Sequence, residues 1–180
     1  MSEQPTWIFG YGSLIWNPGF EVLERREGWI QGWQRRFYQG SPDHRGTPQH
    51  MGRVVTLLPR PEARVWGVAY RPPAQQLRDI MARLDHREQG GYAHARVQVR
   101  TDDGSNIDAL TYIATEQNPF FLGARPLEVM AQRIARAHGP SGPNRAYLFA
   151  LEEALERAQA HDPHVTRLAR AVRAVLAEDP

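Results

Sequence analysis

The chain contains no cysteine and no lysine among its 180 residues. Without cysteine it can form no disulfide bond, no thiolate nucleophile and no zinc site built on thiolates. Because all 22 basic residues are arginine, Schiff-base chemistry and a P-loop lysine are excluded as well. The groups left for chemistry are hydroxyls, imidazoles, carboxylates and backbone amides.

Long apolar runs are also missing. No stretch approaches the roughly 18 apolar residues that a membrane-spanning helix needs, and residues 1–5 lack the basic and apolar regions of a signal peptide. We therefore expect a cytoplasmic protein that does not enter a membrane. The formal net charge of +2 suits a small anionic substrate and does not call for nucleic acid as a partner.

The composition is that of an ordinary globular protein, with 41% hydrophobic and 23% charged residues. We find no repeat, no low-complexity tract and no linker long enough to divide the chain. A chain of this length buries about 70% of its unfolded surface. The sequence therefore predicts a single domain over residues 1–180.

The first two thirds of the sequence are dominated by patterns typical of β-strands. Apolar or alternating segments predict strands at the positions 7–10, 28–38, 53–59, 64–70, 93–99 and 107–114. An irregular loop is expected over residues 41–52, because it contains two prolines and two glycines. The two strands at 53–59 and 64–70 are expected to form a hairpin with a turn at Arg60 to Ala63.

Helical patterns are found after Pro72-Pro73 and in the last third of the chain. Apolar residues at i, i+3, i+4 and i+7 predict a helix that carries Leu77, Ile80, Met81 and Leu84 and ends before Gly90-Gly91. Further helices are expected over 127–137, from Asn144, and from Asp162-Pro163, where an N-cap precedes a first-turn proline. Strands that come first and helices that cluster late favour an α+β fold with a compact sheet or barrel.

The segment from Trp7 to Leu14 is the most informative part of the sequence. An apolar run leads directly into Gly10-Tyr11-Gly12-Ser13, which predicts a buried strand that opens into a tight loop. Glycine allows backbone N–H groups to converge on a carboxylate or phosphate. Tyr11 and Ser13 are candidates for a nucleophile or for hydrogen-bond donors.

Glu88 is the candidate acid–base residue. It follows the expected helix at Leu84-Asp85-His86-Arg87, and a carboxylate at a helix C-terminus is disfavoured by about 0.3–1 kcal/mol. Together with partial burial, that unfavourable position raises the pKa of a carboxyl group towards the range of a useful base.

Several other site types do not fit the motifs. The third glycine of a dinucleotide-binding loop is absent, and Gly12-Ser13-Leu14 is not the nucleophile elbow of a serine hydrolase. The seven histidines form no recognisable metal motif, so no metal site is expected. The arginines and aromatic residues are more typical of paired surface charges and of a core than of a nucleic-acid interface.

Taken in order, the motifs of this chain resemble those of ChaC-type γ-glutamylcyclotransferases over about residues 7–175. The matching segments include Phe9 to Trp16, Asp43 to Pro48, Gly52 to Leu57, Trp66 to Tyr70, Leu84 to Tyr92, Asn118-Pro119 and Gly139 to Asn144 with Tyr147-Leu148. One departure is Met51, where the family usually has proline.

The resemblance implies a small mixed β-barrel with surrounding helices, the γ-glutamylcyclotransferase-like fold. It also implies cleavage of glutathione to 5-oxoproline and cysteinylglycine with no metal or organic cofactor. Glu88 would be the catalytic residue. From the chemistry of the reaction we take Tyr147 or Asn144 as candidates to stabilise an oxyanion. The residues that the resemblance places at the γ-glutamyl group are Ile8, Phe9, Gly10, Tyr11, Gly12, Ser13 and Leu14.

The chemistry implied by the resemblance agrees with the residues available. The substrate's own α-amine attacks its γ-carbonyl, so the protein needs only one group that removes and returns a proton, together with donors that hold the substrate. Two alternatives stay open: a cyclotransferase for other γ-glutamyl amines or amino acids, and a non-catalytic regulator of cation transport. We expect a monomer or a weak dimer.

Overall fold

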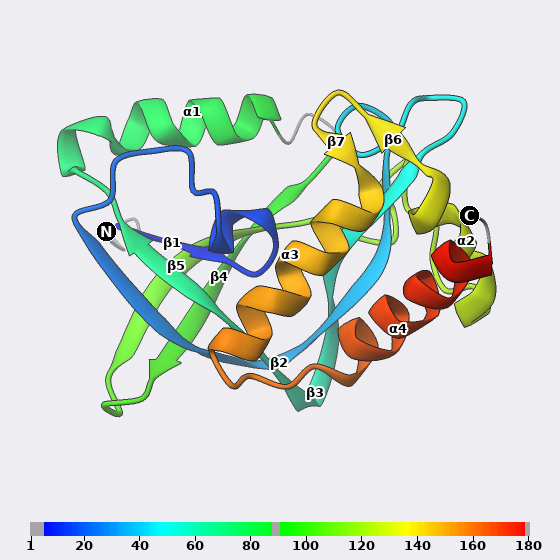
Figure 1. Ribbon diagram of the computed structural model, residues 1–180. Helices are drawn as coiled ribbons and strands as arrows, with labels where there is room; N and C mark the ends of the chain where they lie inside the picture. The colour runs from blue at the N-terminus through cyan, green and yellow to red at the C-terminus, as the bar shows by residue number, and fades with distance from the viewer. Residues whose placement is uncertain (1–5, 88–90, 179–180) are drawn as a thin grey trace. The chain divides into compact units, whose positions relative to one another are not determined.

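The computed structural model describes residues 6–87 and 91–178, with the side chains of residues 86 and 87 excepted. Figure 1 shows the long strands in the first two thirds of the chain and most of the helices in the last third. The strands are β1 (Trp7–Gly10), β2 (Glu24–Ser41), β3 (Gly52–Arg71), β4 (Ala93–Thr101), β5 (Asn106–Ile113), β6 (His138–Gly139) and β7 (Gly142–Pro143). The helices are α1 (Leu77–Arg87), α2 (Leu127–Arg136), α3 (Asn144–Arg157) and α4 (Pro163–Glu178), with short 3-10 turns η1 (Ser13–Ile15) and η2 (Ala74–Gln76).

The larger sheet is a closed barrel in the order β1-β3-β2-β4-β5, and β6 and β7 form a separate two-stranded sheet. Strand β1 is antiparallel to β3, with Ile8 opposite Tyr70, and parallel to β5, with Trp7 opposite Ala109. The long antiparallel ladder of β4 and β5 runs from Ala93 opposite Ile113 to Arg100 opposite Asn106. The predicted α+β class and mixed barrel are confirmed.

The predicted hairpin turn at Arg60 to Ala63 is wrong, because β3 continues through these residues without a break. Pro59 and Pro61 lie in an exposed part of the strand, where the missing N–H of proline costs little. Gln31 of β2 donates a hydrogen bond from Nε2 to the carbonyl oxygen of Pro61 at 2.9 Å. Strands β2 and β3 are connected by the irregular loop that was predicted over residues 41–52.

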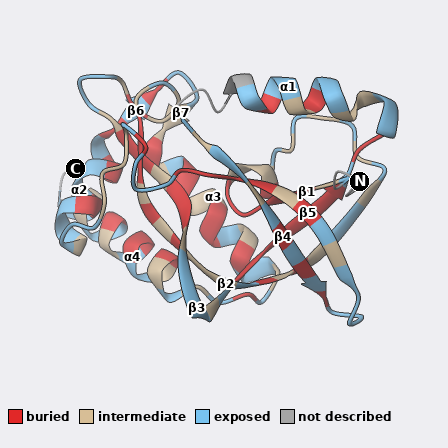
Figure 2. Ribbon diagram, turned by 180° about the vertical axis from the view of Figure 1, so that it is seen from behind, coloured by how far each residue is buried: buried red, intermediate tan, exposed pale blue. Residues whose placement is uncertain are grey.

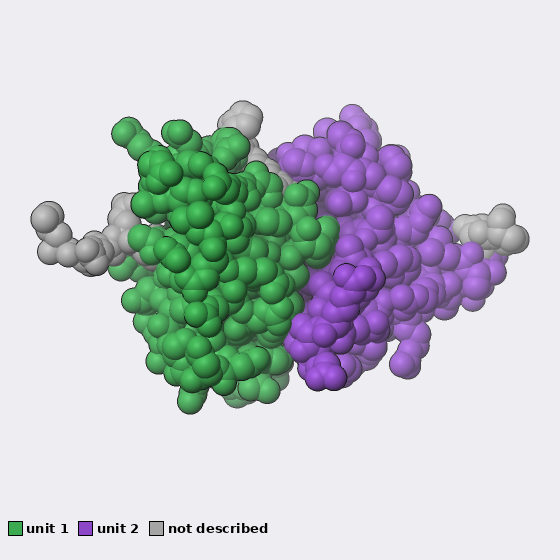
Figure 3. Space-filling view, turned by 60° about the vertical axis from the view of Figure 1, so that its left-hand side comes forward, with its two compact units in different colours: residues 1–34, 57–119 green, residues 35–56, 120–180 purple. Residues whose placement is uncertain are grey.

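The chain divides into two compact units (Figure 3). Unit 1 comprises Met1–Gln34 and Leu57–Pro119, and unit 2 comprises Arg35–Thr56 and Phe120–Pro180. The single domain predicted for residues 1–180 stays a prediction.

Unit 1 contains β1, β4, β5 and helix α1. The stripe predicted for α1 is partly confirmed, since Ile80 and Leu84 are buried and Leu77 and Met81 are partly buried against them. These side chains pack with Ile8 of β1 and Tyr112 of β5. Helix α1 is therefore fixed on the strand that leads into the glycine-rich loop.

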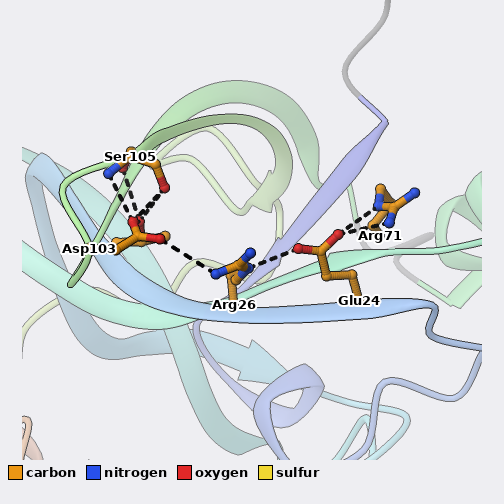
Figure 4. Close-up of polar contacts among 6 residues, drawn as sticks. Glu24, Arg26, Arg71, Asp103 and Ser105 are labelled. Atoms are coloured by element: carbon orange, nitrogen blue, oxygen red, sulfur yellow. Dashed lines mark hydrogen bonds and ion pairs between the residues drawn. The ribbon is translucent and has the colours of Figure 1, made fainter.

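A chain of ion pairs lies on the surface of unit 1 (Figure 4). Glu24 accepts hydrogen bonds from Arg26 and Arg71 at 2.8 Å each, and Arg26 lies 3.5 Å from Asp103. Hydrogen bonds hold the pKa of Asp103 well below its usual range, and the bond from the Thr101 hydroxyl has the largest effect. Exposed pairs of this kind add little stability each, but these link β2, β3 and the β4–β5 turn.

Unit 2 contains helices α2, α3 and α4, which pack on one another. Figure 2 shows buried residues along one side of these helices. The buried residues include Met130, Ile134, Leu148, Leu151, Leu155, Val165, Leu168 and Val172, and Val175 is partly buried. The predicted N-cap of α4 is confirmed, because Asp162 Oδ1 accepts the N–H of His164 at 3.1 Å. Asp162 Oδ2 also pairs with Arg35, whose side chain is 1% exposed, at 2.9 Å.

His164 is held in its neutral form. Its Nε2 accepts a hydrogen bond from the backbone N–H of Phe37 at 3.0 Å, and its ring packs against the rings of Phe37 and Tyr38. Burial, followed by the positive charge of Arg36, lowers the pKa of His164 to about 4. Protonation would turn Nε2 of His164 into a donor that faces the N–H of Phe37, which is itself a donor. The folded state therefore disfavours the protonated form.

We expect the stability of the protein to fall as the pH decreases from about 6.5 towards 4. In this window the unfolded chain takes up a proton on His164 that the folded chain does not, so the free energy of unfolding decreases by up to about 1.4 kcal/mol per pH unit. Urea unfolding at pH 7, 6 and 5 tests this. His164→Gln keeps a side-chain acceptor but does not titrate, so its slope should be shallower. An unchanged slope would contradict the assignment.

Candidate functional site

The glycine loop (Gly10–Leu14) connects β1 to η1 in unit 1. Gly10 ends β1 opposite Val68 of β3, and the chain then turns back so closely that a Cβ on Gly10 would lie 2.6 Å from Cβ of Leu14. Within the turn, the N–H of Ile15 donates to the carbonyl of Gly12 at 3.0 Å, and that of Asn17 donates to Ser13 at 2.8 Å. The predicted strand and tight loop are confirmed, and the lack of a side chain at Gly10 is what permits the turn.

Three hydroxyl groups hold the glycine loop and the strand before it. Tyr11 donates from its hydroxyl to the carbonyl oxygen of Tyr112 at 2.6 Å, and Thr111 donates to that of Phe9 at 2.9 Å. The Tyr70 hydroxyl lies 2.7 Å from the carbonyl oxygen of Leu14, and burial raises its pKa. The hydroxyl of Tyr11, predicted as a nucleophile or donor, therefore serves to fix the loop in this structure.

The head of the glycine loop, where Gly12 and Leu14 lie, offers backbone N–H groups as hydrogen-bond donors. No side chain in the described part of the chain caps η1 at Gly12, and none of those residues accepts a hydrogen bond from the N–H of Gly12 or Leu14. N–H groups at the start of a helical turn favour an anionic acceptor. This geometry supports the prediction that the loop holds a carboxylate.

Glu88, the predicted catalytic carboxylate, lies outside the described residues, as does Gly90. What the structure describes is the helix that leads to it, since α1 ends at Arg87. That helix packs through Ile80 and Leu84 in one cluster with Ile8 and Leu14, two of the predicted substrate-binding residues. The role of Glu88 stays a prediction.

Asn144 and Tyr147, the predicted oxyanion residues, lie together at the start of α3 in unit 2. The Asn144 side chain is fully buried and pairs with the backbone of Arg53, accepting from its N–H at 2.7 Å and donating to its carbonyl at 2.8 Å. The Tyr147 hydroxyl lies 3.4 Å from the backbone N of Val55. Both side chains thus hold the beginning of β3, and their contact with substrate stays a prediction.

Arg53 carries a buried charge, although its sequence pattern predicts only a place in a strand. The residue is 2% exposed, and its guanidinium donates to the carbonyls of Phe37 and Gly123 at 2.9 Å each. Burial, followed by the charges of Arg133 and Arg125, lowers its pKa to about 10. No neighbouring carboxylate in the described residues pairs with it. The sequence feature that could have indicated this buried charge is the position of Arg53 directly before the largely apolar run Val54 to Leu58.

Within residues 6–87 and 91–178, no three histidine, aspartate or glutamate side chains gather closely enough to hold a metal ion. None of the helices described there is both long and apolar enough to cross a membrane.

We expect Asn144→Ala to destabilise unit 2 strongly. The substitution leaves a buried N–H and a buried carbonyl of Arg53 without partners, at about 1–3 kcal/mol each. Urea unfolding measures the loss. Asn144→Asp keeps the oxygen that accepts from Arg53 and should retain part of the stability. A variant Asn144→Ala that unfolds at the wild-type urea concentration would show that these two hydrogen bonds do not support β3.

Comparisons with known proteins agree with this architecture. The model of the ChaC-like protein family matches residues 6–175. Gamma-glutamylcyclotransferase 2-3 of Arabidopsis thaliana is 45% identical over 96% of this chain and 90% of its own length. Glutathione-specific gamma-glutamylcyclotransferase 1 of Rattus norvegicus is 41% identical over 96% of this chain and 81% of its own.

A solved structure is similar as well. The crystal structure of the glutathione-specific γ-glutamyl cyclotransferase from yeast superimposes with a TM-score of 0.89 at 30% identity, over 96% of this chain and 97% of that one. The resemblance drawn from the motifs is thereby confirmed. The chain belongs to the ChaC-like family of γ-glutamylcyclotransferases.

Proposed function

We propose that this protein is a γ-glutamylcyclotransferase that cleaves glutathione to 5-oxoproline and cysteinylglycine. The observation that carries the proposal is the packing of α1, the helix that leads to Glu88, in one cluster with Ile8 and Leu14 around the glycine loop. Relatives from Rattus norvegicus and Escherichia coli, at 41% and 37% identity, are named as glutathione-specific enzymes of this type. A cytoplasmic location and a monomer or weak dimer stay predictions.

In the proposed reaction the nucleophile belongs to the substrate. Backbone N–H groups at the head of the glycine loop hold the α-carboxylate of the γ-glutamyl group and bend the chain so that its α-amine approaches the γ-carbonyl. Glu88 takes a proton from the α-ammonium group. The freed amine attacks the γ-carbonyl carbon and forms a five-membered ring with a tetrahedral centre.

The second half of the reaction returns the proton. As the bond between the γ-carbon and the cysteine nitrogen breaks, the protonated Glu88 donates to that nitrogen. The ring nitrogen loses its second proton as the lactam forms, and that proton passes to the departing amine, so the amine of cysteinylglycine leaves as an ammonium group. The carbonyl of 5-oxoproline forms again, and Glu88 is ionised for the next cycle. Asn144 and Tyr147 are proposed to stabilise the oxyanion of the tetrahedral centre.

We expect Glu88→Gln to lower kcat for glutathione by at least about 100-fold, because the amide cannot accept the proton. Release of 5-oxoproline, measured by chromatography, tests this, and calorimetry tests whether the variant still binds glutathione. Glu27→Gln is the matched control, since Glu27 is a surface carboxylate whose partner is Arg25 at 2.6 Å. The mechanism fails if Glu88→Gln is folded and as active as the control.

The substrate class is tested by comparing kcat/KM for glutathione with that for γ-glutamyl amino acids lacking the glycine residue. A preference for glutathione supports the proposed specificity. A preference for the shorter compounds would support the broader cyclotransferase. No turnover of any γ-glutamyl compound would contradict both.

A further inference from the structure

Tyr112 of β5 contacts both the glycine loop and helix α1. Its backbone carbonyl accepts the hydroxyl hydrogen bond of Tyr11 at 2.6 Å, and its own hydroxyl donates to Oδ1 of Asp85 at 2.9 Å. Tyr112 is 7% exposed and belongs to the apolar cluster with Ile8 and Leu84. One residue therefore joins the loop to the end of α1 by direct hydrogen bonds at both sides.

Asp85 receives a second hydrogen bond. Nε2 of His94 on β4 lies 2.7 Å from the same Oδ1, and because an ionised carboxylate can only accept, the imidazole is the donor. The ring of His94 also packs edge-on against the ring of Tyr112, with centroids 4.7 Å apart. Asp85, His94 and Tyr112 thus touch pairwise, and they come from α1, β4 and β5. We name these three residues the Asp85 cluster.

The Asp85 cluster is poorly placed to serve stability alone. The side chains of Asp85 and His94 are 49% and 44% exposed, and ion pairs with that much solvent access contribute about 0–1 kcal/mol. Asp85 also lies in the last turn of α1, where the helix dipole disfavours a negative charge. What the cluster does provide is a fixed orientation, because three contacts on two strands define where the last turn of α1 lies.

We propose that Asp85, His94 and Tyr112 are positioning residues that set the end of α1, and hence Glu88 three residues beyond Asp85, relative to the glycine loop. The inference rests on the proposed function, in which Glu88 moves the proton. Reaction rates depend steeply on such placement, since a misplacement of about 1 Å can cost about 100-fold. The hydrogen bonds from Tyr11 through Tyr112 to Asp85 link the glycine loop to the helix that precedes Glu88 in the sequence.

The experiment compares three variants with the wild type. Tyr112→Phe removes only the hydroxyl and keeps the ring and the carbonyl that holds Tyr11. Asp85→Ala removes the shared acceptor, whereas Asp85→Asn keeps an oxygen for the Tyr112 hydroxyl. The matched control is Asp103→Asn, which alters a hydrogen-bonded aspartate of the β4–β5 turn in the same unit.

We expect Tyr112→Phe and Asp85→Ala to lower kcat for glutathione by about 5- to 50-fold with KM changed less than twofold. Their urea midpoints should stay close to that of the control. Asp85→Asn should recover most of the rate. Hydrogen exchange of the backbone amides at 84–87 should be faster in Asp85→Ala than in the control, which tests the position of the helix end independently of turnover.

The inference is overturned if both variants keep the wild-type kcat, or if exchange at 84–87 is unchanged. It is also overturned if kcat falls only as far as the folded fraction falls, because that pattern is expected of a structural role. The proposed function is judged separately, by 5-oxoproline release from the wild type and by Glu88→Gln.

Discussion

Helix α1 has eleven residues, and a helix of that length is marginal in water unless its apolar face is covered. In unit 1 that face is covered by Ile8 of β1 and Tyr112 of β5, against which Ile80 and Leu84 are almost fully buried. Burial of such side chains contributes about 1.5–3 kcal/mol each. The same contact that allows α1 to form therefore fixes it beside the strand that opens into the glycine loop, and the proposed active site depends on it.

The absence of cysteine and lysine fits a reaction whose nucleophile comes with the substrate. In the proposed mechanism the protein holds a carboxylate, bends a flexible chain and moves protons from the attacking to the departing nitrogen, which backbone N–H groups and a single side-chain carboxylate would accomplish. The hydroxyls of Tyr11 and Tyr70 are engaged with backbone carbonyls. Their contribution is to keep the loop in one shape, and in the proposed mechanism that shape would let its N–H groups meet a carboxylate without reorganisation.

Local patterns in the sequence predicted most of the elements, because alternation in β4 and the apolar spacing in α1, α3 and α4 reflect which face is buried. The turn at Arg60 to Ala63 was wrong, since proline is tolerated in the exposed part of a long strand. The motifs predicted the family. Contacts such as Tyr112 with Asp85, or Asn144 with Arg53, join residues 27 and 91 positions apart, and no local pattern encodes such pairings.

The most direct test of the central claim is the origin of the oxygen atoms in the product. If glutathione is incubated with the enzyme in water enriched in oxygen-18, intramolecular attack by the α-amine predicts 5-oxoproline that contains no oxygen from the solvent, as mass spectrometry would show. Free glutamate carrying one solvent oxygen would mean that water is the nucleophile, and it would contradict cyclisation by the substrate's own amine.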